Sequence, residues 1–123
     1  MRKFYRFIKD MMKSTTQIPD LEINEFLQQY ENVNNAILLD VRSPKETSKG
    51  IIKGATIINY MDNSFGSKIK ELDKSKSYYI YCRSGRRSMN ACIAMQEIGI
   101  QKVANSKGGY LAYLKLNNNI NRN

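Results

Sequence analysis

The stretch that decides the fold is residues 78–88, which run Tyr78-Tyr79-Ile80-Tyr81-Cys82-Arg83-Ser84-Gly85-Arg86-Arg87-Ser88. Its first four residues form an apolar and aromatic run, which predicts a buried strand. A short basic loop follows, and from Ser88 onward apolar residues recur at helical spacing until Gly99 ends the helix. Cys82 therefore lies where a strand passes into a helix N-terminus, beside three arginines. Helix N-termini and nearby cations stabilise a thiolate, so this position predicts a nucleophilic cysteine.

The segments on either side of this stretch predict a parallel sheet. Residues 36–41 form a nearly continuous apolar run, which is typical of a strand buried on both faces. We expect two further strands, at 56–59 and 102–105. We also expect a helix that begins after Asn24 as its N-cap, and two more helices at 69–72 and 110–116. Strands that alternate with helices predict an α/β fold with helices on both faces of the sheet. Ligands bind to such sheets beyond the carboxyl ends of the strands, where Cys82 lies.

The length and composition predict one intracellular domain. A chain of 123 residues, 41% hydrophobic and 25% charged, has room for one ordinary core. Two cysteines and no secretory apolar segment favour reduced thiols and a cytoplasmic location. No stretch approaches the ~20 apolar residues of a membrane span.

The net charge of +9 is concentrated in two places. One is a basic N-terminal arm, residues 1–20, and the other is the loop after Cys82; the remaining lysines are scattered. This distribution does not indicate a nucleic-acid partner. We expect the arm to pack on a domain at 21–116, as a helix or an extended arm, rather than to bind a membrane. We expect an unstructured polar tail at 117–123.

The loop resembles the active-site loop of the rhodanese family, in which a cysteine is followed by two residues, glycine, one residue, arginine, and then serine, alanine or threonine. Cys82, Gly85, Arg87 and Ser88 fill these positions, and the resemblance extends over roughly residues 21–114. It implies a rhodanese-like parallel sheet and a single-domain sulfurtransferase of the thiosulfate type, with Cys82 as the covalent sulfur carrier. It also implies that the persulfide is bound by the residues that follow the cysteine, namely Arg83, Ser84, Gly85, Arg86, Arg87 and Ser88.

The expected reaction needs no cofactor or metal. The chain contains no histidine, so the loop alone must activate the thiol. Partners implied by the resemblance are a small anionic sulfur donor, a cyanide or thiol acceptor, and a protein that exchanges persulfide sulfur. The mechanism requires a thiol that is both ionised and open to solvent.

A second segment, Asp40-Val41-Arg42-Ser43-Pro44-Lys45-Glu46, resembles another rhodanese signature. We expect Asp40, Arg42 and Glu46 to support the site, with Arg42 and Glu46 paired to fix the loop that follows. The chain departs from its relatives at Ile51, Lys53 and Tyr113, where the family often has histidine, proline and tryptophan. These departures affect supporting packing and the docking of the acceptor.

Three alternatives are weighed against this hypothesis. Phosphatases that work through a phosphocysteine, and the related arsenate reductases, place five residues between cysteine and arginine, whereas four separate Cys82 from Arg87. A non-catalytic binding or redox-sensing module on the rhodanese fold stays open. A purely structural Cys82 would have no need of arginines.

Cys92 lies about two turns into the helix, too far along it to form a disulfide with Cys82, so we expect it to pack in the core.

Overall fold

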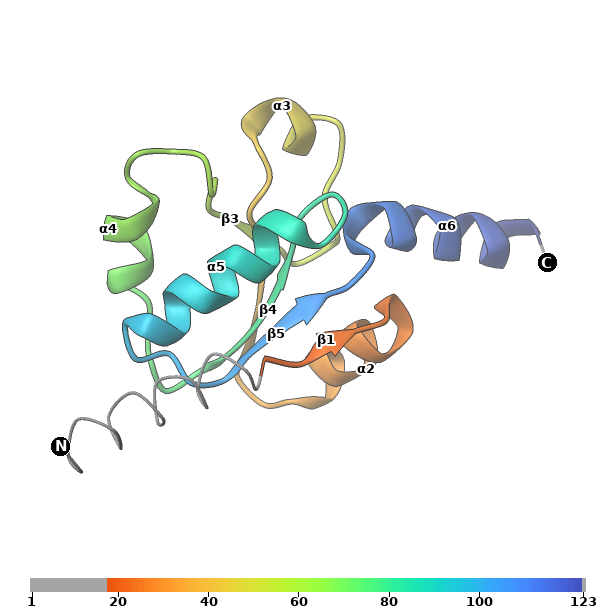
Figure 1. The fold of residues 1–123 in the computed structure, drawn as a ribbon. Coiled ribbons are helices and arrows are strands. Elements are labelled where there is room, and N and C mark those ends of the chain that lie inside the picture. The colour runs from red at the N-terminus through yellow and green to blue at the C-terminus, as the bar shows by residue number, and fades with distance from the viewer. Residues whose placement is uncertain (1–17, 123) are drawn as a thin grey trace, which may run out of the picture.

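The computed structural model describes residues 18–122, which form a parallel sheet between two layers of helices (Figure 1). The strands are β1 (Asp20–Leu21), β2 (Ala36–Asp40), β3 (Thr56–Ile57), β4 (Ser77–Tyr81) and β5 (Val103–Ser106). The helices are α2 (Ile23–Asn32), α3 (Pro44–Thr47), α4 (Phe65–Lys70), α5 (Arg86–Glu97) and α6 (Gly109–Arg122). This architecture confirms the predicted fold class. The predicted packing of residues 1–17 of the basic arm lies outside the described residues.

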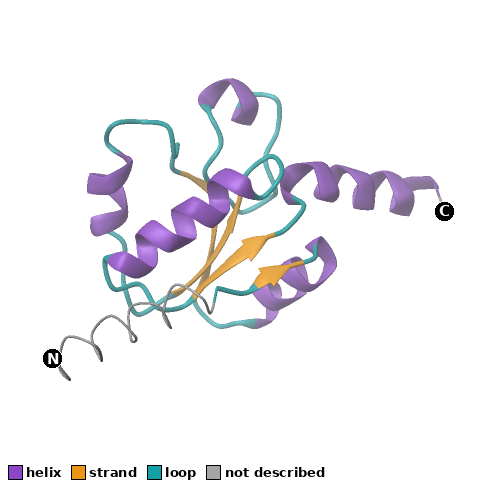
Figure 2. Ribbon diagram, in the orientation of Figure 1, coloured by secondary structure: helices purple, strands orange, loops and turns teal. Residues whose placement is uncertain are grey.

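Helices cover both faces of the sheet (Figure 2), and buried residues form a hydrophobic core on each side of it. Neighbouring strand residues point to opposite faces, so Leu39 and Ile80 enter the core under α4 and α5, whereas Leu38 and Tyr79 enter the other. The second core is closed by α2 and α6, with Phe26 completely buried. The continuous apolar runs of β2 and β4 are explained by this burial on both faces.

The strand order is β1-β5-β4-β2-β3, and every pair of neighbours is parallel. After β2 the chain adds β3 on one side, and after β4 it adds β5 on the other, so the order reverses between β2 and β4. Asp40 and Tyr81 are register partners at the carboxyl ends of these two strands. Cys82, the next residue, therefore lies at the switch point where α/β sheets bind ligands.

Several sequence-based boundaries were wrong. Residues 117–122 of the predicted unstructured tail are helical, because α6 continues to Arg122. Leu116 packs against the second core, and extending a formed helix costs far less than starting one. Asn24 is not a cap, since α2 begins at Ile23 with Glu22 before it.

Other elements were shifted or missed. Helix α4 begins at Phe65 rather than at residue 69, and β1 and α3 were not predicted. Strand β1 is only two residues long and is held by β5. Within residues 18–122, no helix is long and apolar enough to cross a membrane.

Candidate active site

Cys82 follows the last residue of β4, and the loop after it bends back over its sulfur. The Gly85 amide lies 3.1 Å from Sγ and the Ser88 hydroxyl 3.3 Å from it, and both donate hydrogen bonds. Gly85 precedes α5 with a φ of +98°. Only glycine adopts this conformation without strain, and a Cβ here would overlap the backbone oxygens of Ser106 and Lys107. The turn at Gly85 therefore brings backbone amides to the thiol.

These hydrogen bonds set the ionisation of Cys82. Burial by itself would raise the pKa of the thiol, but the net effect is a pKa below the ordinary value. The lowering comes mainly from the Ser88 hydroxyl and then from the backbone amides of Ser88, Gly85 and Ser84. A thiolate is the nucleophilic form of cysteine. The sequence argument gave the arginine charges a large share of this effect, whereas the hydrogen bonds of the loop provide most of it.

Cys82 is not open to solvent. Its residue is 1% exposed, and Ser88 beside it is completely buried. The outer side of the loop is exposed at Arg83, Ser84 and Arg86. The sequence-based requirement of an accessible thiol is therefore not met by this conformation.

Arg87 binds a carboxylate of the protein. Its guanidinium donates to both oxygens of Glu46, at 2.8 and 2.9 Å. This bidentate bond is the main reason why the pKa of Glu46 is lowered to about 2. Glu46 also completes a capping box with Ser43 at the start of α3. Arg87 therefore ties the loop to α3, while Arg83 and Arg86 stay exposed.

Arg42 and Glu46 do not pair, so this prediction was wrong. Arg42 forms a buried ion pair with Asp40, with Nη2 2.7 Å from a carboxylate oxygen, and also donates to the Gly50 carbonyl at 2.6 Å. Its guanidinium lies over the ring of Tyr110, 4.0 Å from the centroid. A four-residue spacing suggested a local pair, but each side chain found a better partner elsewhere. Glu46 contacts the loop through Arg87, and Asp40 is the register partner of Tyr81, the residue before Cys82.

Asn105 in β5 and the residues that begin α6 hold the loop from the other side, and sequence reasoning missed them. The Asn105 amide donates to the Gly85 carbonyl and to Asp20, both at 3.0 Å. The backbone amides of Tyr110 and Leu111 donate to the carbonyls of Cys82 and Arg83. The only sequence signal was the Gly108-Gly109 turn. Its second glycine has a φ of +60° and lies so close to Cys82 and Arg83 that a Cβ would overlap their carbonyl oxygens.

Comparison with known proteins identifies the family of this chain. The family model for the rhodanese-like domain matches residues 22–116. The chain belongs to the rhodanese-like domain family. It is 35% identical over 97 residues to the putative sulfurtransferase YtwF of Bacillus subtilis, covering 79% of this chain and 91% of that protein. It is 28% identical over 98 residues to a protein of Allochromatium vinosum named a sulfurtransferase, covering 80% of this chain and 90% of that one.

A solved structure shows the same fold. The rhodanese-like domain protein from Staphylococcus aureus superposes with a TM-score of 0.66 at 24% identity, covering 78% of this chain and 91% of that one. At this identity the likeness concerns the arrangement of the chain alone. It confirms the predicted rhodanese-like sheet.

The second cysteine of this rhodanese-like domain has the opposite environment. Cys92 on α5 is completely buried in the core under α4 and α5. Burial raises the pKa of its thiol, which keeps it protonated. The structure thus agrees with the prediction that Cys92 packs in the core, and it leaves Cys82 as the cysteine that can supply a thiolate.

Proposed function

We propose that this rhodanese-like protein is a sulfurtransferase that carries sulfane sulfur as a persulfide on Cys82. The donor is thiosulfate or a small persulfide, and the acceptor is cyanide or a thiol. One observation carries the proposal: the Cys82 sulfur receives hydrogen bonds from Gly85 and Ser88 that lower the pKa of its thiol. Membership of the rhodanese-like family and the similarity to two proteins named as sulfurtransferases support an enzyme of this class.

The reaction is two successive exchanges at sulfur. The Cys82 thiolate attacks the outer sulfur of thiosulfate, a new S–S bond forms, and sulfite leaves with the electron pair of the broken bond. The outer sulfur of the resulting persulfide is then attacked by cyanide or a thiolate, which releases the Cys82 thiolate. The amides of Ser84, Gly85 and Ser88 can stabilise the negative charge in both anionic states.

Opening of the loop is part of this proposal, because Cys82 is 1% exposed. The exposed side chains of Arg83 and Arg86 can attract an anionic donor to the outer face of the loop. Arg87 is held by Glu46, so we place it as a support of the loop and not as a ligand of the donor.

The decisive experiment is intact mass spectrometry after treatment with thiosulfate, together with a thiosulfate:cyanide assay. We expect the wild type to gain about 32 Da, one sulfur atom, and to release thiocyanate on addition of cyanide. Cys82→Ser should do neither, and Cys92→Ala should do both. If the wild type gains no sulfur from thiosulfate or from any small persulfide, the proposal is wrong.

The burial of Cys82 favours a second candidate, a binding or redox-sensing module that uses the rhodanese-like fold without turnover. The same measurements separate the two. The module would show no persulfide and no thiocyanate with any donor, and its binding of a partner would survive Cys82→Ser.

A further inference from the structure

Asn105 connects the edge of the sheet to the candidate active loop. Its residue is 1% exposed, and its amide nitrogen donates to the Gly85 carbonyl and to a carboxylate oxygen of Asp20, both at 3.0 Å. An amide nitrogen carries two N–H donors, so it can serve both acceptors at once. Asp20 belongs to β1, and Gly85 directly precedes α5. The Asn105 side chain therefore bridges a strand and a loop that are far apart in the sequence.

The amide oxygen of Asn105 is buried and has no hydrogen-bond partner among residues 18–122. A buried acceptor without a partner costs about as much as a good hydrogen bond contributes. The reverse orientation of the amide would place this oxygen against the Asp20 carboxylate and the Gly85 carbonyl, which both accept and do not donate. The two acceptors together therefore hold the amide in an orientation that leaves its oxygen unpaired. With only one acceptor left, the amide would be free to rotate until its oxygen finds a donor.

The pairing of β1 with β5 fixes the position of Asp20. Strand β1 lies at the edge of the sheet beside β5 (Figure 1), and Asp20 is the register partner of Asn105. The backbone is bound on both sides of Asp20, because the Asn105 amide donates to the Pro19 carbonyl and the Lys107 amide to the Leu21 carbonyl, both at 2.8 Å. The carboxylate of Asp20 is thus presented to Asn105 from a fixed backbone, although the residue itself is exposed.

Gly85 is a residue whose direction needs such a support. Its amide donates to the Cys82 sulfur at 3.1 Å. Glycine adopts more backbone conformations than any other residue, so its own sterics do not keep its φ at +98°. Its carbonyl accepts from the Met89 amide at 3.2 Å and from Asn105. The Met89 bond belongs to the first turn of α5 and moves with the helix, whereas the Asn105 bond fixes Gly85 relative to the sheet.

We infer that Asp20 and Asn105 are positioning residues for the candidate nucleophile: Asp20 orients the Asn105 amide, and Asn105 holds Gly85, whose amide stabilises the Cys82 sulfur. The inference extends the site from the loop to the edge strand β1. It rests on the proposed function for its meaning in turnover. Its test measures the ionisation of the thiol and needs no sulfur transfer, so each of the two can fail without the other.

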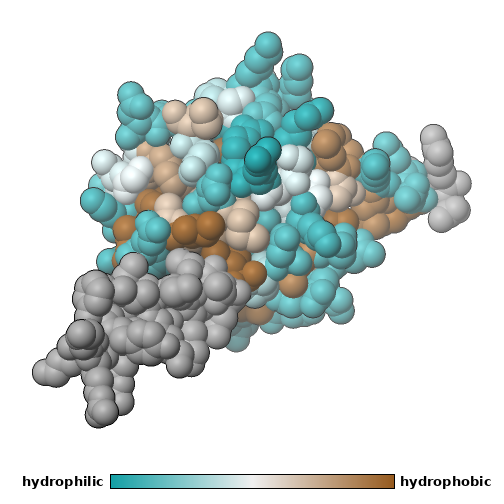
Figure 3. Space-filling model, viewed as in Figure 1, coloured by the Kyte–Doolittle hydropathy of each residue, from teal (hydrophilic) through white to brown (hydrophobic). Residues whose placement is uncertain are grey.

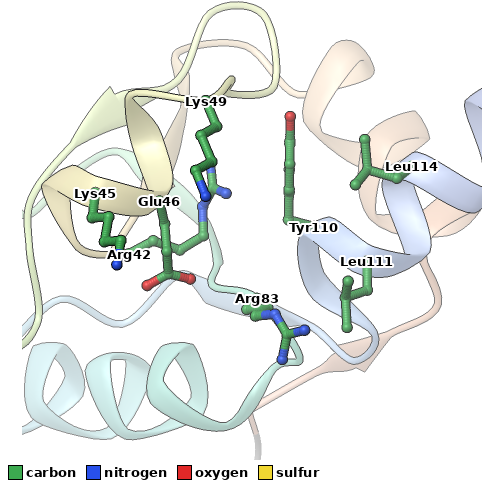
Figure 4. A pocket seen from close by; sticks show the side chains of 8 residues that line it. All are labelled: Arg42, Lys45, Glu46, Lys49, Arg83, Tyr110, Leu111 and Leu114. Atoms are coloured by element: carbon green, nitrogen blue, oxygen red, sulfur yellow. The ribbon is translucent and has the colours of Figure 1, made fainter.

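The charged groups around Cys82 on the loop and on α3 belong to other supports. Arg83 and Arg86 lie on the exposed outer side of the loop, and Arg87 is bound to Glu46. Figure 4 shows Arg83 and Glu46 in the wall of a cavity of about 380 Å³ between the loop, α3 and α6. Helix α6 holds the loop through backbone amides, and its side chains add hydrophobic surface at the right of Figure 3. Substitutions in β1 and β5 leave all of these groups in place.

The charge of Asp20 has to be separated from its hydrogen bond. Burial and then this charge raise the pKa of the Cys92 thiol, so the charge of Asp20 is felt inside the domain. If Asp20 acted on Cys82 by charge alone, its removal would lower the pKa of Cys82, because a repulsion of the thiolate would be lost. A positioning role predicts the opposite sign, since a loosened Gly85 amide stabilises the thiolate less.

Asp20→Ala and Asp20→Asn form a matched pair, because both remove the charge and only asparagine keeps an oxygen that can accept from Asn105. The readout is the midpoint of Cys82 alkylation by iodoacetamide as a function of pH. Asp20→Ala should raise this midpoint by about 0.3–1 pH unit, where the upper value corresponds to complete loss of the Gly85 bond. Asp20→Asn should not raise it. Glu22→Ala removes an exposed charge at the residue after β1 and should leave the midpoint unchanged.

Asn105→Ala tests the order of action. It should raise the midpoint at least as much as Asp20→Ala does, and Asp20→Ala added to it should raise the midpoint no further. Urea unfolding of each variant shows that folded protein is being compared. The inference is overturned if Asp20→Ala and Asp20→Asn give the same midpoint, or if Asp20→Ala raises the midpoint equally with and without Asn105.

Persulfide formation separates this inference from the proposed function. If the midpoints move as expected but no donor places sulfur on Cys82, the positioning role stands and the sulfurtransferase proposal fails. If thiosulfate or a small persulfide loads Cys82 while the Asp20 variants leave the midpoint unchanged, the positioning role fails alone.

Discussion

Ser88→Ala removes the side chain that contributes most to the low pKa of Cys82. The Ser88 hydroxyl donates to Sγ at 3.3 Å from a completely buried position, so no solvent molecule in this conformation provides the same bond. The backbone amides of Ser84, Gly85 and Ser88 stay in place in the variant. The thiolate should therefore be destabilised while the loop keeps its shape.

The size of the effect follows from the bond that is lost. Hydrogen bonds to charged groups contribute about 1.5–3 kcal/mol, and for a weak sulfur acceptor we take the lower end, about 1.5 kcal/mol. This corresponds to roughly a tenfold smaller acid dissociation constant. The pKa of Cys82 rises in the variant, so the alkylation rate falls at neutral pH and recovers at higher pH. A thiolate of higher pKa is also more nucleophilic, which makes the plateau rate roughly threefold greater.

Alkylation by iodoacetamide, followed by intact mass at a series of pH values, measures both effects. Cys92 is buried with a raised thiol pKa, so one adduct is expected in the folded protein. Ser84→Ala is the matched control, because Ser84 is exposed and its contribution to the low pKa of Cys82 comes from its backbone amide. The reasoning is refuted if the Ser88→Ala profile superposes on that of the wild type, or if Ser84→Ala shifts it equally. Complete resistance of the wild type to alkylation would refute the opening of the loop.

Three further changes test the supports of the loop. Gly85→Ala should lower the free energy of unfolding in urea by at least about 2 kcal/mol, because the new Cβ would lie in a left-handed backbone and overlap the carbonyl oxygens of Ser106 and Lys107. Gly66→Ala is the control. Nothing lies within 4 Å of its new Cβ, so it should raise the free energy of unfolding by about 0.5–1 kcal/mol. Glu46→Gln should lower the free energy of unfolding by about 1 kcal/mol at pH 7, because the bidentate bond to Arg87 is lost. Because the pKa of Glu46 is lowered from 4.5 to about 2, this difference should shrink as the pH falls between these values. A double-mutant cycle with Arg87→Met that shows no coupling would contradict the pair. Asn105→Ala should lower the free energy of unfolding by about 1 kcal/mol, because it removes the side-chain bond to the Gly85 carbonyl, which keeps only the bond from the Met89 amide. Unchanged stability and Cys82 alkylation would contradict its positioning role.

The spacing of residues 82–88 was enough to predict the candidate nucleophile, and the alternation of apolar runs with helical patterns along the chain predicted the fold class. A glycine three residues after Cys82 predicts a turn that brings amides to the sulfur, and the structure shows this turn with a φ of +98°. The apolar runs of β2 and β4 predicted strands that are buried on both faces, because neighbouring apolar residues of a strand point to opposite faces of the sheet. Such features depend on residues close together in the chain.

Pairings between distant residues could not be predicted in this way. Glu46 and Arg87 are 41 residues apart, and nothing in either segment distinguishes this pair from the local pair of Arg42 and Glu46. Asn105 is a polar residue near the end of a short strand, and its bond to Gly85 depends on strand order. The capping box at Ser43 was different, because serine, proline and a following Glu46 carry a local signal that was overlooked.

The burial of Cys92 limits the ways in which a sulfur atom carried on Cys82 would leave. Cys92 is protonated and sealed inside the core under α5, so it cannot displace a sulfur atom from Cys82 by closing an internal disulfide. A protein with a persulfide on Cys82 would be unable to release the sulfur through its second cysteine. It would keep the sulfur until a separate acceptor molecule attacks it. The lifetime of the persulfide would then depend on the concentration of that acceptor and on how often the loop exposes the sulfur.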